Sequence, residues 1–280
     1  MRIKDAIDAL SVRFKAQGMQ NARYEAKLII AASLGLTQLM LCVEDQRHLS
    51  KDELTRIKEC GLRRMQGEPL SYIAGKKEFY GLEFLVSPAT LIPRPETELL
   101  VDLATENTAS NQVFADLGTG CGNIGIAIAN QRPHWQGFLI EKSWAALSIA
   151  QKNCQRLVPT SRLVLLAMDW SHFAIKARSF HLMVANPPYI AASELALVQK
   201  DVLNYEPHTS LFSANEGLAD IATIIAIAKH SLKPKGRLLL EHGYKQGESV
   251  AALCREHGFR QIHTHQDLAG LDRVTSAQFL

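Results

Sequence analysis

Cysteine is scarce in this sequence, and none of it is closely paired. The chain has five cysteines in 280 residues, an odd number without any Cys-x-x-Cys spacing. They are Cys42, Cys60, Cys121, Cys154 and Cys254. Scattered cysteines of this kind are typical of reduced thiols in a cytosolic protein, and they argue against a disulfide framework or a zinc site. We therefore expect no bound metal.

Long apolar runs are also missing. The longest, residues 28–36 and 221–228, are far too short to cross a bilayer, which takes about 20 residues. The chain opens with Met-Arg-Ile-Lys-Asp, without the apolar region of a secretory signal. The sequence thus predicts a cytoplasmic protein that does not bind membranes.

Charge of one sign is not in large excess. The formal net charge of +3 is too weak to indicate a stable nucleic-acid partner. Residues 63–77 contain a local basic stretch, for which a solvated face is the favoured interpretation and a partner contact the alternative. Its members are Arg63, Arg64, Lys76 and Lys77.

Two patterns of apolar residues divide the chain. Up to about residue 75 they recur at helical spacing, and Ser50 with Glu53 forms a capping box that opens one helix, with Gly61 or Gly67 as its end. A short hairpin is expected within residues 78–86. We predict three regions: a helical domain (1–75), a β-hairpin linker (76–95) and a larger domain (96–280).

In the larger domain, strand-like apolar runs alternate with helical stretches. The runs are 113–117, 138–140, 163–167, 182–185 and 238–240. This alternation is typical of a parallel sheet with helices on both faces, so we predict an α/β fold. Residues 261–266 and 274–279 predict an antiparallel hairpin at the end of the chain. Ligands of such sheets bind beyond the carboxyl ends of the strands.

The first of these strands runs into a glycine-rich loop. Residues 116–122 read Asp-Leu-Gly-Thr-Gly-Cys-Gly, and a helix is expected from about Asn123. Glycines let the backbone turn tightly and approach a ligand, while the N–H groups of the helix start face it. Residues 120–125 also satisfy the dinucleotide pattern G-x-G-x-x-G, so the loop predicts a cofactor site without choosing the cofactor.

The next two strand ends add an acid and an aromatic ring. Glu141 lies roughly 20 residues beyond the loop, where an acid that binds ribose hydroxyls is expected, although capping of the next helix is an alternative. Trp170, which follows Asp169, could cover a purine or pack a loop onto the core.

The fourth strand ends in Asn186-Pro187-Pro188-Tyr189. Pro187 holds Asn186 in an extended conformation, and Pro188 stiffens the segment further. The Asn186 amide oxygen and the Pro187 carbonyl can then accept hydrogen bonds from an NH₂ group, and Tyr189 offers a flat face. The segment predicts a site for a planar amide or an exocyclic amine.

Together, the glycine loop and Asn-Pro-Pro-Tyr resemble the class I S-adenosylmethionine methyltransferases that act on planar nitrogen in adenine, cytosine or glutamine. Residues 67–102, Glu-Pro-His at 206–208, and the segments LLLEHGYKQGE and DLAGLDRV narrow the resemblance. They are similar to the PrmC (HemK) family, the release factor glutamine methyltransferases, over essentially the whole chain.

This resemblance implies a Rossmann-like, mostly parallel sheet with a C-terminal antiparallel hairpin, preceded by a helical domain that docks the substrate. It implies methyl transfer from S-adenosylmethionine to the amide nitrogen of glutamine in the Gly-Gly-Gln motif of class I peptide chain release factors, which supports translation termination. The cofactor residues would be Gly118, Thr119, Gly120, Cys121, Gly122, Glu141, Trp170 and Asn186. The substrate residues would be Asn186, Pro187, Pro188 and Tyr189, among which Asn186, Pro187 and Tyr189 would be catalytic.

Two positions depart from the family pattern. The acid of the second strand is usually aspartate and here is Glu141, one methylene longer. Cys121 occupies a position that is more often small and polar. A thiol is small enough for a tight loop, so neither change alters the assignment.

The mechanism expected from these residues is a direct displacement without a metal or a covalent enzyme intermediate. Asn186 and Pro187 would accept hydrogen bonds from the attacking NH₂ group and hold it in line with the methyl donor. Three alternatives remain. A nucleic-acid N6-adenine or N4-cytosine methyltransferase would bind an extruded base in the same way. A nicotinamide oxidoreductase would use the glycine loop and Glu141 but would leave residues 186–189 unexplained. A non-catalytic binding protein would not need both the glycine loop and the Asn-Pro-Pro-Tyr segment intact.

Overall fold

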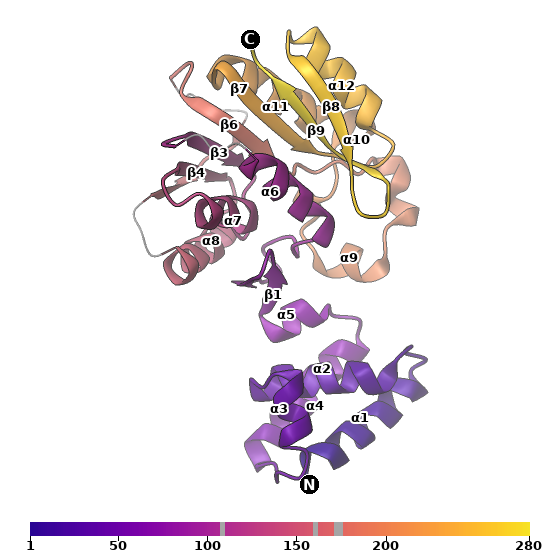
Figure 1. Ribbon diagram of the computed structural model, residues 1–280. Helices are drawn as coiled ribbons and strands as arrows, with labels where there is room; N and C mark the ends of the chain where they lie inside the picture. Colours follow the sequence, from indigo (N-terminus) through magenta and orange to yellow (C-terminus); the bar gives the residue numbers. More distant parts are fainter. Residues whose placement is uncertain (107–109, 159–161, 171–175) are drawn as a thin grey trace. The chain divides into compact units, whose positions relative to one another are not determined.

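The computed structural model describes residues 1–106, 110–158, 162–170 and 176–280 (Figure 1). The chain separates into two compact units. One consists of residues 1–76 with 200–205, and the other of residues 77–199 with 206–280. From Lys77 onwards, the hairpin that we assigned to a linker therefore belongs to the second unit. The division into docking, linker and catalytic domains stays a prediction.

The first unit is helical. Its helices are α1 (Ile3–Ala16), α2 (Ala22–Leu34), α3 (Gln38–Val43), α4 (Lys51–Met65), α5 (Leu70–Ala74) and α9 (Lys200–Tyr205). In α1, Ile7, Leu10 and Phe14 lie on one face and are at most 5% exposed, because they pack against α2 in a shared core. Amphipathic spacing thus forms this unit, as the sequence predicts.

Helix α4 begins at the predicted capping box. The Ser50 hydroxyl accepts a hydrogen bond from the Glu53 N–H at 3.2 Å, and the Glu53 carboxylate accepts one from the Ser50 N–H at 2.8 Å. The helix continues through Gly61 and ends at Met65. Gly67, with a φ of 93°, follows the helix, so Gly67 rather than Gly61 marks its end.

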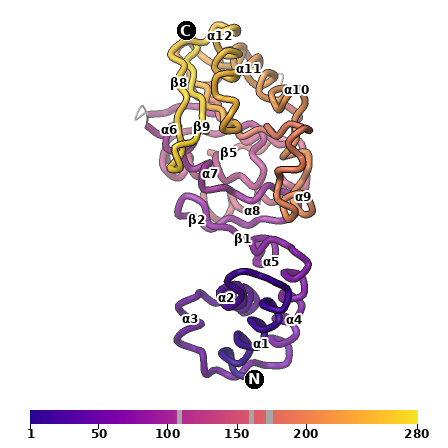
Figure 2. Tube along the Cα trace, turned by 90° about the vertical axis from the view of Figure 1, so that its right-hand side faces the viewer, coloured from indigo at the N-terminus to yellow at the C-terminus, as the bar shows by residue number. Residues whose placement is uncertain are grey.

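The second unit is built on a sheet that has seven strands within the described residues, in the order β5-β4-β3-β6-β7-β9-β8. The strands are β3 (Val113–Leu117), β4 (Gln136–Glu141), β5 (Leu163–Ala167), β6 (Phe180–Ala185), β7 (Leu232–Glu241), β8 (Arg260–Gln266) and β9 (Asp272–Gln278). Strands β3 to β7 pair in parallel. Strand β9 is antiparallel to both β7 and β8, and Figure 2 shows it running beside β8. The predicted parallel sheet and terminal hairpin are confirmed.

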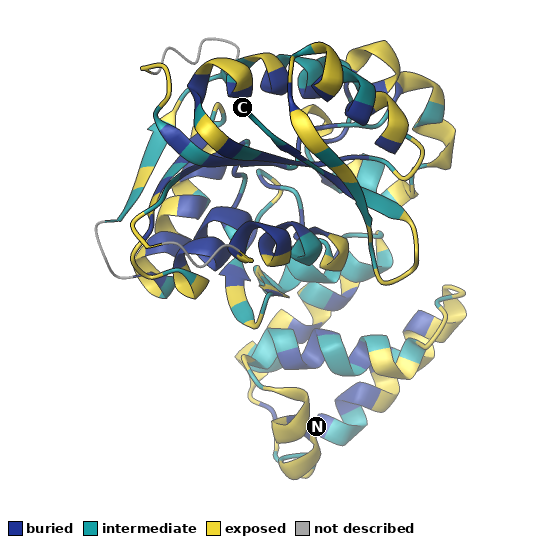
Figure 3. Cartoon of the chain, turned by 45° about the horizontal axis from the view of Figure 1, so that its top comes forward, coloured by how far each residue is buried: buried dark blue, intermediate teal, exposed yellow. Residues whose placement is uncertain are grey.

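Helices cover both faces of this sheet (Figure 3). One face carries α6 (Glu98–Thr105), α7 (Asn123–Gln131) and α8 (Trp144–Leu157), and the other carries α11 (Ala219–Ser231) and α12 (Gly247–Glu256). Short elements complete the unit: η1 (Pro95–Thr97), η3 (Ala192–Leu197), η4 (His208–Ser210) and α10 (Ala214–Gly217). Alternate residues of β3 enter the two cores: Phe114 faces one, and Ala115 and Leu117 face the other. Burial on both faces explains the continuous apolar runs.

The short hairpin is fixed to the second unit by one buried asparagine. Strands β1 (Lys76–Phe79) and β2 (Leu82–Leu85) are joined by Tyr80 and Gly81, both with positive φ. The fully buried Asn153 of α8 accepts a hydrogen bond from the Leu85 N–H at 2.8 Å. Its amide donates at 2.9 Å to both the Leu85 and the Cys121 carbonyls. Asn153 therefore connects the hairpin to the glycine loop.

The strand order determines where a ligand can bind. Strands β4 and β5 lie on one side of β3, and β6 lies on the other, so the winding direction changes between β3 and β6. The loops that follow these four strands carry the motifs found in the sequence. In open α/β sheets such a reversal leaves a crevice at the carboxyl edge.

Candidate active site

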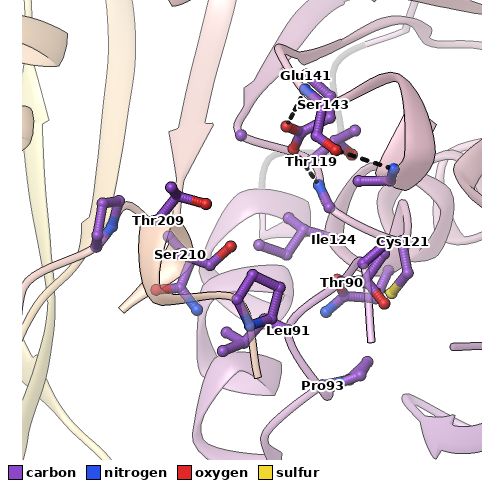
Figure 4. Close-up of a pocket in the computed structure, with 18 of the residues that line it drawn as sticks. Thr90, Leu91, Pro93, Thr119, Cys121, Ile124, Glu141, Ser143, Thr209 and Ser210 are labelled. Atoms are coloured by element: carbon purple, nitrogen blue, oxygen red, sulfur yellow. Dashed lines mark hydrogen bonds between the residues drawn. The ribbon is translucent and has the colours of Figure 1, made fainter. Parts of the chain in front are cut away.

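A cavity of about 280 Å³ lies at this edge of the sheet (Figure 4). It is lined by the loops after β3, β4, β5 and β6, and by segments 88–97 and 207–210. The predicted site residues that line it are Gly118, Thr119, Gly120, Cys121, Glu141, Trp170, Asn186 and Pro188. Among the other predicted residues, Gly122, Pro187 and Tyr189 do not contribute to the lining.

The glycine loop presents bare backbone to the cavity. Gly118 has a φ of 74°, and an added Cβ would lie only 2.7 Å from the Trp170 ring. Gly120 has a φ of 56°, and an added Cβ would meet nothing within 4 Å. The space beside Gly120 is therefore open, so a ligand can approach the backbone closely there.

Asp116 holds the shape of this loop. Its buried Oδ2 atom accepts hydrogen bonds from the Thr119 hydroxyl at 2.6 Å and from the Gly125 N–H at 3.0 Å. Burial raises the pKa of Asp116 to about 6, and the nearby charge of Glu141 acts in the same direction. Sequence reasoning quoted this acid as the start of the motif but gave it no role.

Glu141 is bound between the glycine loop and the start of α8. Its Oε2 atom accepts from the Gly120 N–H at 3.1 Å, and its Oε1 atom accepts from the Ser143 N–H at 2.9 Å. Since each carboxylate oxygen can accept more than one hydrogen bond, two further donors, such as vicinal hydroxyls, can still be bound. Ser143 itself caps α8 by accepting from the Ala146 N–H.

Trp170 forms one wall of the cavity and also packs against the core. Its ring lies against Gly118, and the Lys142 ammonium is 5.6 Å from the ring centroid. Both interpretations of this residue, a wall against a flat ring and a packing residue, are consistent with its position. Nearby, burial raises the pKa of the Cys121 thiol to about 12, so this cysteine is not a nucleophile at neutral pH.

The Asn-Pro-Pro-Tyr segment leaves the sheet directly after β6. Asn186 is half-buried, and its Nδ2 atom donates a hydrogen bond to the Thr97 hydroxyl at 3.2 Å. Pro187 and Pro188 are both buried. The Tyr189 carbonyl accepts from the Gln246 side chain at 3.0 Å, which fixes the end of the segment.

The Tyr189 hydroxyl points to a buried acid. Its hydroxyl donates to the Glu241 Oε1 atom at 3.4 Å, and burial raises the tyrosine pKa. Glu241 is the last residue of β7 and is only 1% exposed. Sequence reasoning missed both Thr97 and Glu241 as parts of this site. The one indication of Glu241 in the sequence was its place within a segment quoted for the family resemblance.

The proline-containing segment that we assigned to a linker is part of the cavity wall. Pro93 and Arg94 both line the cavity. Buried Glu206 accepts a hydrogen bond from the Ile92 N–H at 3.1 Å and forms an ion pair with Arg94. Pro207 follows directly and lines the cavity too. The acid thus joins two segments that are far apart in the sequence.

Within the described residues, no His, Cys, Asp and Glu side chains cluster in a way that could hold a metal ion. None of the helices in the same part of the chain is long and apolar enough to span a membrane. The polar side chains that line the cavity are the Glu141 carboxylate, the amides of Asn123 and Asn186, the cations Arg94 and Lys142 and several hydroxyls, and Trp170 is its one large aromatic ring within the described residues.

Comparisons with known proteins cover nearly all of the chain. The model of the PrmC N-terminal domain matches residues 5–75, and that of the methyltransferase small domain matches residues 95–205. The release factor glutamine methyltransferase of Buchnera aphidicola subsp. Schizaphis graminum is 37% identical, covering 94% of this chain and 95% of that protein. The Pseudomonas aeruginosa protein of the same name is 39% identical, with 92% and 93% covered.

Solved structures share the fold. A methyltransferase from Pyrococcus furiosus superimposes with a TM-score of 0.56 at 16% identity, covering 78% of this chain and 98% of that chain. The second unit therefore has the class I S-adenosylmethionine-dependent methyltransferase fold, a mostly parallel sheet with antiparallel strands at its C-terminal end.

Proposed function

Because the chain belongs to the family of release factor glutamine methyltransferases, we propose that it methylates class I peptide chain release factors. The acceptor is the side-chain amide nitrogen of the glutamine in their Gly-Gly-Gln motif, and the donor is S-adenosylmethionine. The reaction takes place in the cytoplasm, where these factors act in translation termination. Similarity over more than nine-tenths of the chain supports assigning the function to the chain as a whole.

The cavity fits S-adenosylmethionine. The open space at Gly120 admits the methionine part against bare backbone, and the free lone pairs of Glu141 suit the two ribose hydroxyls. Trp170 lies where it can cover the adenine ring. When bound there, S-adenosylmethionine supplies an electrophilic methyl group. In this proposal Thr119, Cys121 and Gly122 complete the cofactor loop.

Asn186 and Pro187 prepare the acceptor. An amide nitrogen is a poor nucleophile because its lone pair is delocalised, and no ordinary side chain is basic enough to remove its proton first. Hydrogen bonds from both N–H groups to the Asn186 amide oxygen and the Pro187 carbonyl increase electron density on the nitrogen. They also stabilise the positive charge that develops as the new bond forms, and the proton leaves after transfer.

Pro188 and Tyr189 hold the acceptor in position. Pro188 is buried and lines the cavity, and it keeps the backbone of the segment rigid. In the proposal, one face of the Tyr189 ring packs against the planar amide. A rigid site of this kind holds the nitrogen in line with the methyl group at near-attack distance, which lowers the entropic part of the barrier.

The helical unit is the proposed docking region for the release factor. It matches the model of the PrmC N-terminal domain over residues 5–75. Deleting residues 1–75 should therefore raise KM for a folded release factor more than it raises KM for a short Gly-Gly-Gln peptide.

The observation that carries the proposal is that Asn186 lines the same cavity as Gly120 and Glu141. The decisive experiment measures labelled methyl transfer from S-adenosylmethionine to a purified class I release factor. Its Gly-Gly-Ala variant, tRNA, rRNA and DNA serve as parallel acceptors. We expect label on the wild-type factor alone. If nucleic acid were labelled and the release factor were not, the chain would still be a methyltransferase, but the proposed acceptor would be wrong.

A further inference from the structure

Glu241 lies beside the Asn-Pro-Pro-Tyr segment through the pairing of two central strands. Strands β6 and β7 are parallel neighbours, and their last registered pair is Ala185 with Leu240. Asn186 directly follows β6, and Glu241 is the last residue of β7, so the two residues lie side by side at the carboxyl edge of the sheet. No step of the proposed methyl transfer uses this carboxyl group.

The carboxyl group of Glu241 faces hydroxyls on two sides. The Tyr189 hydroxyl donates to its Oε1 atom at 3.4 Å. Thr97 lies close enough to this carboxyl group for its hydroxyl to lower the pKa of Glu241. The Oε2 atom is buried and has no hydrogen-bond partner among the described residues, so it is open to a hydroxyl hydrogen that turns toward it. A buried carboxylate in this position attracts any hydroxyl hydrogen that can turn toward it.

Thr97 links Glu241 to Asn186 through its hydroxyl group. A threonine hydroxyl has a single hydrogen, so once that hydrogen points to Glu241, Oγ1 can only accept from Asn186. Nδ2 of Asn186 is the half of the amide that faces Thr97, at 3.2 Å. The other half, Oδ1, is then free for an N–H donor in the cavity that Asn186 lines.

We infer that Glu241 is a positioning residue that, through Thr97, fixes which way the Asn186 amide faces, and that it also anchors the Tyr189 hydroxyl. Without this acid, the Thr97 hydroxyl can donate to Oδ1 equally well, and the amide can turn its NH₂ group toward the acceptor. The NH₂ groups of Asn186 and of the acceptor amide would then face each other, and neither group could accept a hydrogen bond from the other. The predicted effect on kcat rests on the proposed methyl transfer, whereas the predicted orientation of the Asn186 amide does not depend on it.

The charge on Glu241 is set by its surroundings. Burial raises the pKa of Glu241 to about 7, hydrogen bonding from Thr97 lowers it, and so do the positive charge of Arg273 on β9 and the hydroxyl of Tyr189. The nearby Glu96 of η1 raises it. Because the ionised form is the one that directs the Thr97 hydrogen, turnover should rise with pH through this range.

The test uses the full-length protein in four variants. Thr97→Val removes the hydroxyl, Thr97→Ser keeps it, and Glu241→Gln removes the charge at nearly constant shape. Glu256→Gln, which removes an exposed carboxylate at the end of α12, is the matched control. Each is measured for kcat and KM with release factor, for S-adenosylhomocysteine affinity, for melting temperature and for the NMR signals of the Asn186 side-chain NH₂ group, assigned by their loss in Asn186→Ala.

We expect Thr97→Val and Glu241→Gln to lower kcat by about 10- to 100-fold, as for other outer partners that orient a reacting group, with S-adenosylhomocysteine affinity unchanged. Both should shift the Asn186 NH₂ signals, whereas Thr97→Ser and Glu256→Gln should leave the signals and kcat close to wild type. The decline of wild-type kcat below pH 7 should be absent in Glu241→Gln.

Two results separate this inference from the proposed function. A wild-type protein that methylates no release factor would overturn the function, and the Asn186 signals would still decide the orientation. Signals and kcat that stay unchanged in both Thr97→Val and Glu241→Gln, in folded proteins, would overturn the inference even if release factor is methylated. A fall in melting temperature with unchanged signals would also reject it in favour of a purely structural role.

Discussion

The two ends of the cavity are built in different ways. At the glycine-loop end, backbone N–H groups of Gly120 and Ser143 hold Glu141, and these residues lie within about two dozen positions of one another. At the Asn186 end, side chains meet side chains across 89 and 52 residues of sequence. Backbone groups bind whatever fits their fixed geometry, whereas a chain of side chains can be reoriented by a single proton. We therefore expect changes at the first end to alter cofactor affinity and changes at the second end to alter the rate.

Asn186→Ala should have the largest effect on kcat, and it is the strongest test of the contrast between the two ends of the cavity. Losing one preorganised polar contact with the reacting group costs roughly 10²- to 10³-fold in kcat, or about 3–4 kcal/mol. Asn186 is also among the expected cofactor residues, but the loop and Glu141 are untouched, so S-adenosylhomocysteine affinity, measured by calorimetry, should change by less than about fivefold. Near-normal turnover in a correctly folded variant would remove Asn186 from the mechanism.

The next prediction concerns stability and its dependence on pH. The pKa of Glu241 is raised from 4.5 to about 7, so the folded state retains a proton that the unfolded state has lost between these values. This contribution to stability is fully present below pH 4.5 and disappears as the pH rises through about 7. The wild type should lose up to about 3 kcal/mol over this window relative to Glu241→Gln.

Denaturant unfolding of both proteins at pH 5 and pH 8 measures this difference. Taking the wild type and the variant together removes the contribution of Asp116, which titrates over an overlapping range. A wild-type stability that falls no more than that of Glu241→Gln would show that Glu241 does not titrate as its burial implies. The acid that orders the acceptor end therefore makes the fold less stable at the pH where it is ionised.

Glu141→Ala tests the other end of the cavity. Hydrogen bonds to a charged group contribute about 1.5–3 kcal/mol, so S-adenosylhomocysteine affinity should fall by about 10- to 100-fold. With the cofactor saturating, kcat should remain within about fivefold of the wild type, since Asn186 keeps its partners. A fall in kcat with unchanged affinity would contradict the division between the two ends.

Tyr189→Phe should have the smallest effect. Its hydroxyl donates to Glu241 over 3.4 Å, a long hydrogen bond, and the aromatic ring is retained in the variant. We expect kcat to fall by less than about fivefold, or less than about 1 kcal/mol. A loss as large as that of Asn186→Ala would instead give the hydroxyl a direct part in the reaction.

The same contrast explains what the sequence could predict. Strands β3 and β5 were predicted at 113–117 and 163–167, and the structure has the same bounds. Their apolar runs are continuous because both sheet faces are covered, and that pattern is local. The glycine loop and Asn-Pro-Pro-Tyr are local too, and the structure brings most of their residues to one cavity.

Most of the contacts that sequence reasoning missed are long-range. Ile92 meets Glu206 across 114 residues, and Leu85 meets Asn153 across 68. Glu206 and Thr97 stood within segments quoted for the family resemblance, but no pattern gave either of them, or Asn153, a partner, since each of these side chains acquires its role only when the sheet and its helices are assembled. The segment around Pro93 was assigned to a linker because prolines suggest a connection, and its place in the cavity wall depends on Glu206.

The position of β9 has a consequence for how this protein folds during its synthesis on the ribosome. Strand β9 is the last element to be synthesised, yet it lies between β7 and β8, and its Arg273 faces Glu241. Until residues 272–278 have left the exit tunnel, β7 and β8 have no strand between them to pair with. A nascent chain therefore cannot complete the acceptor end of its cavity until these residues have emerged, although β3, β4 and β5, which carry the glycine-loop end, lie far earlier in the chain.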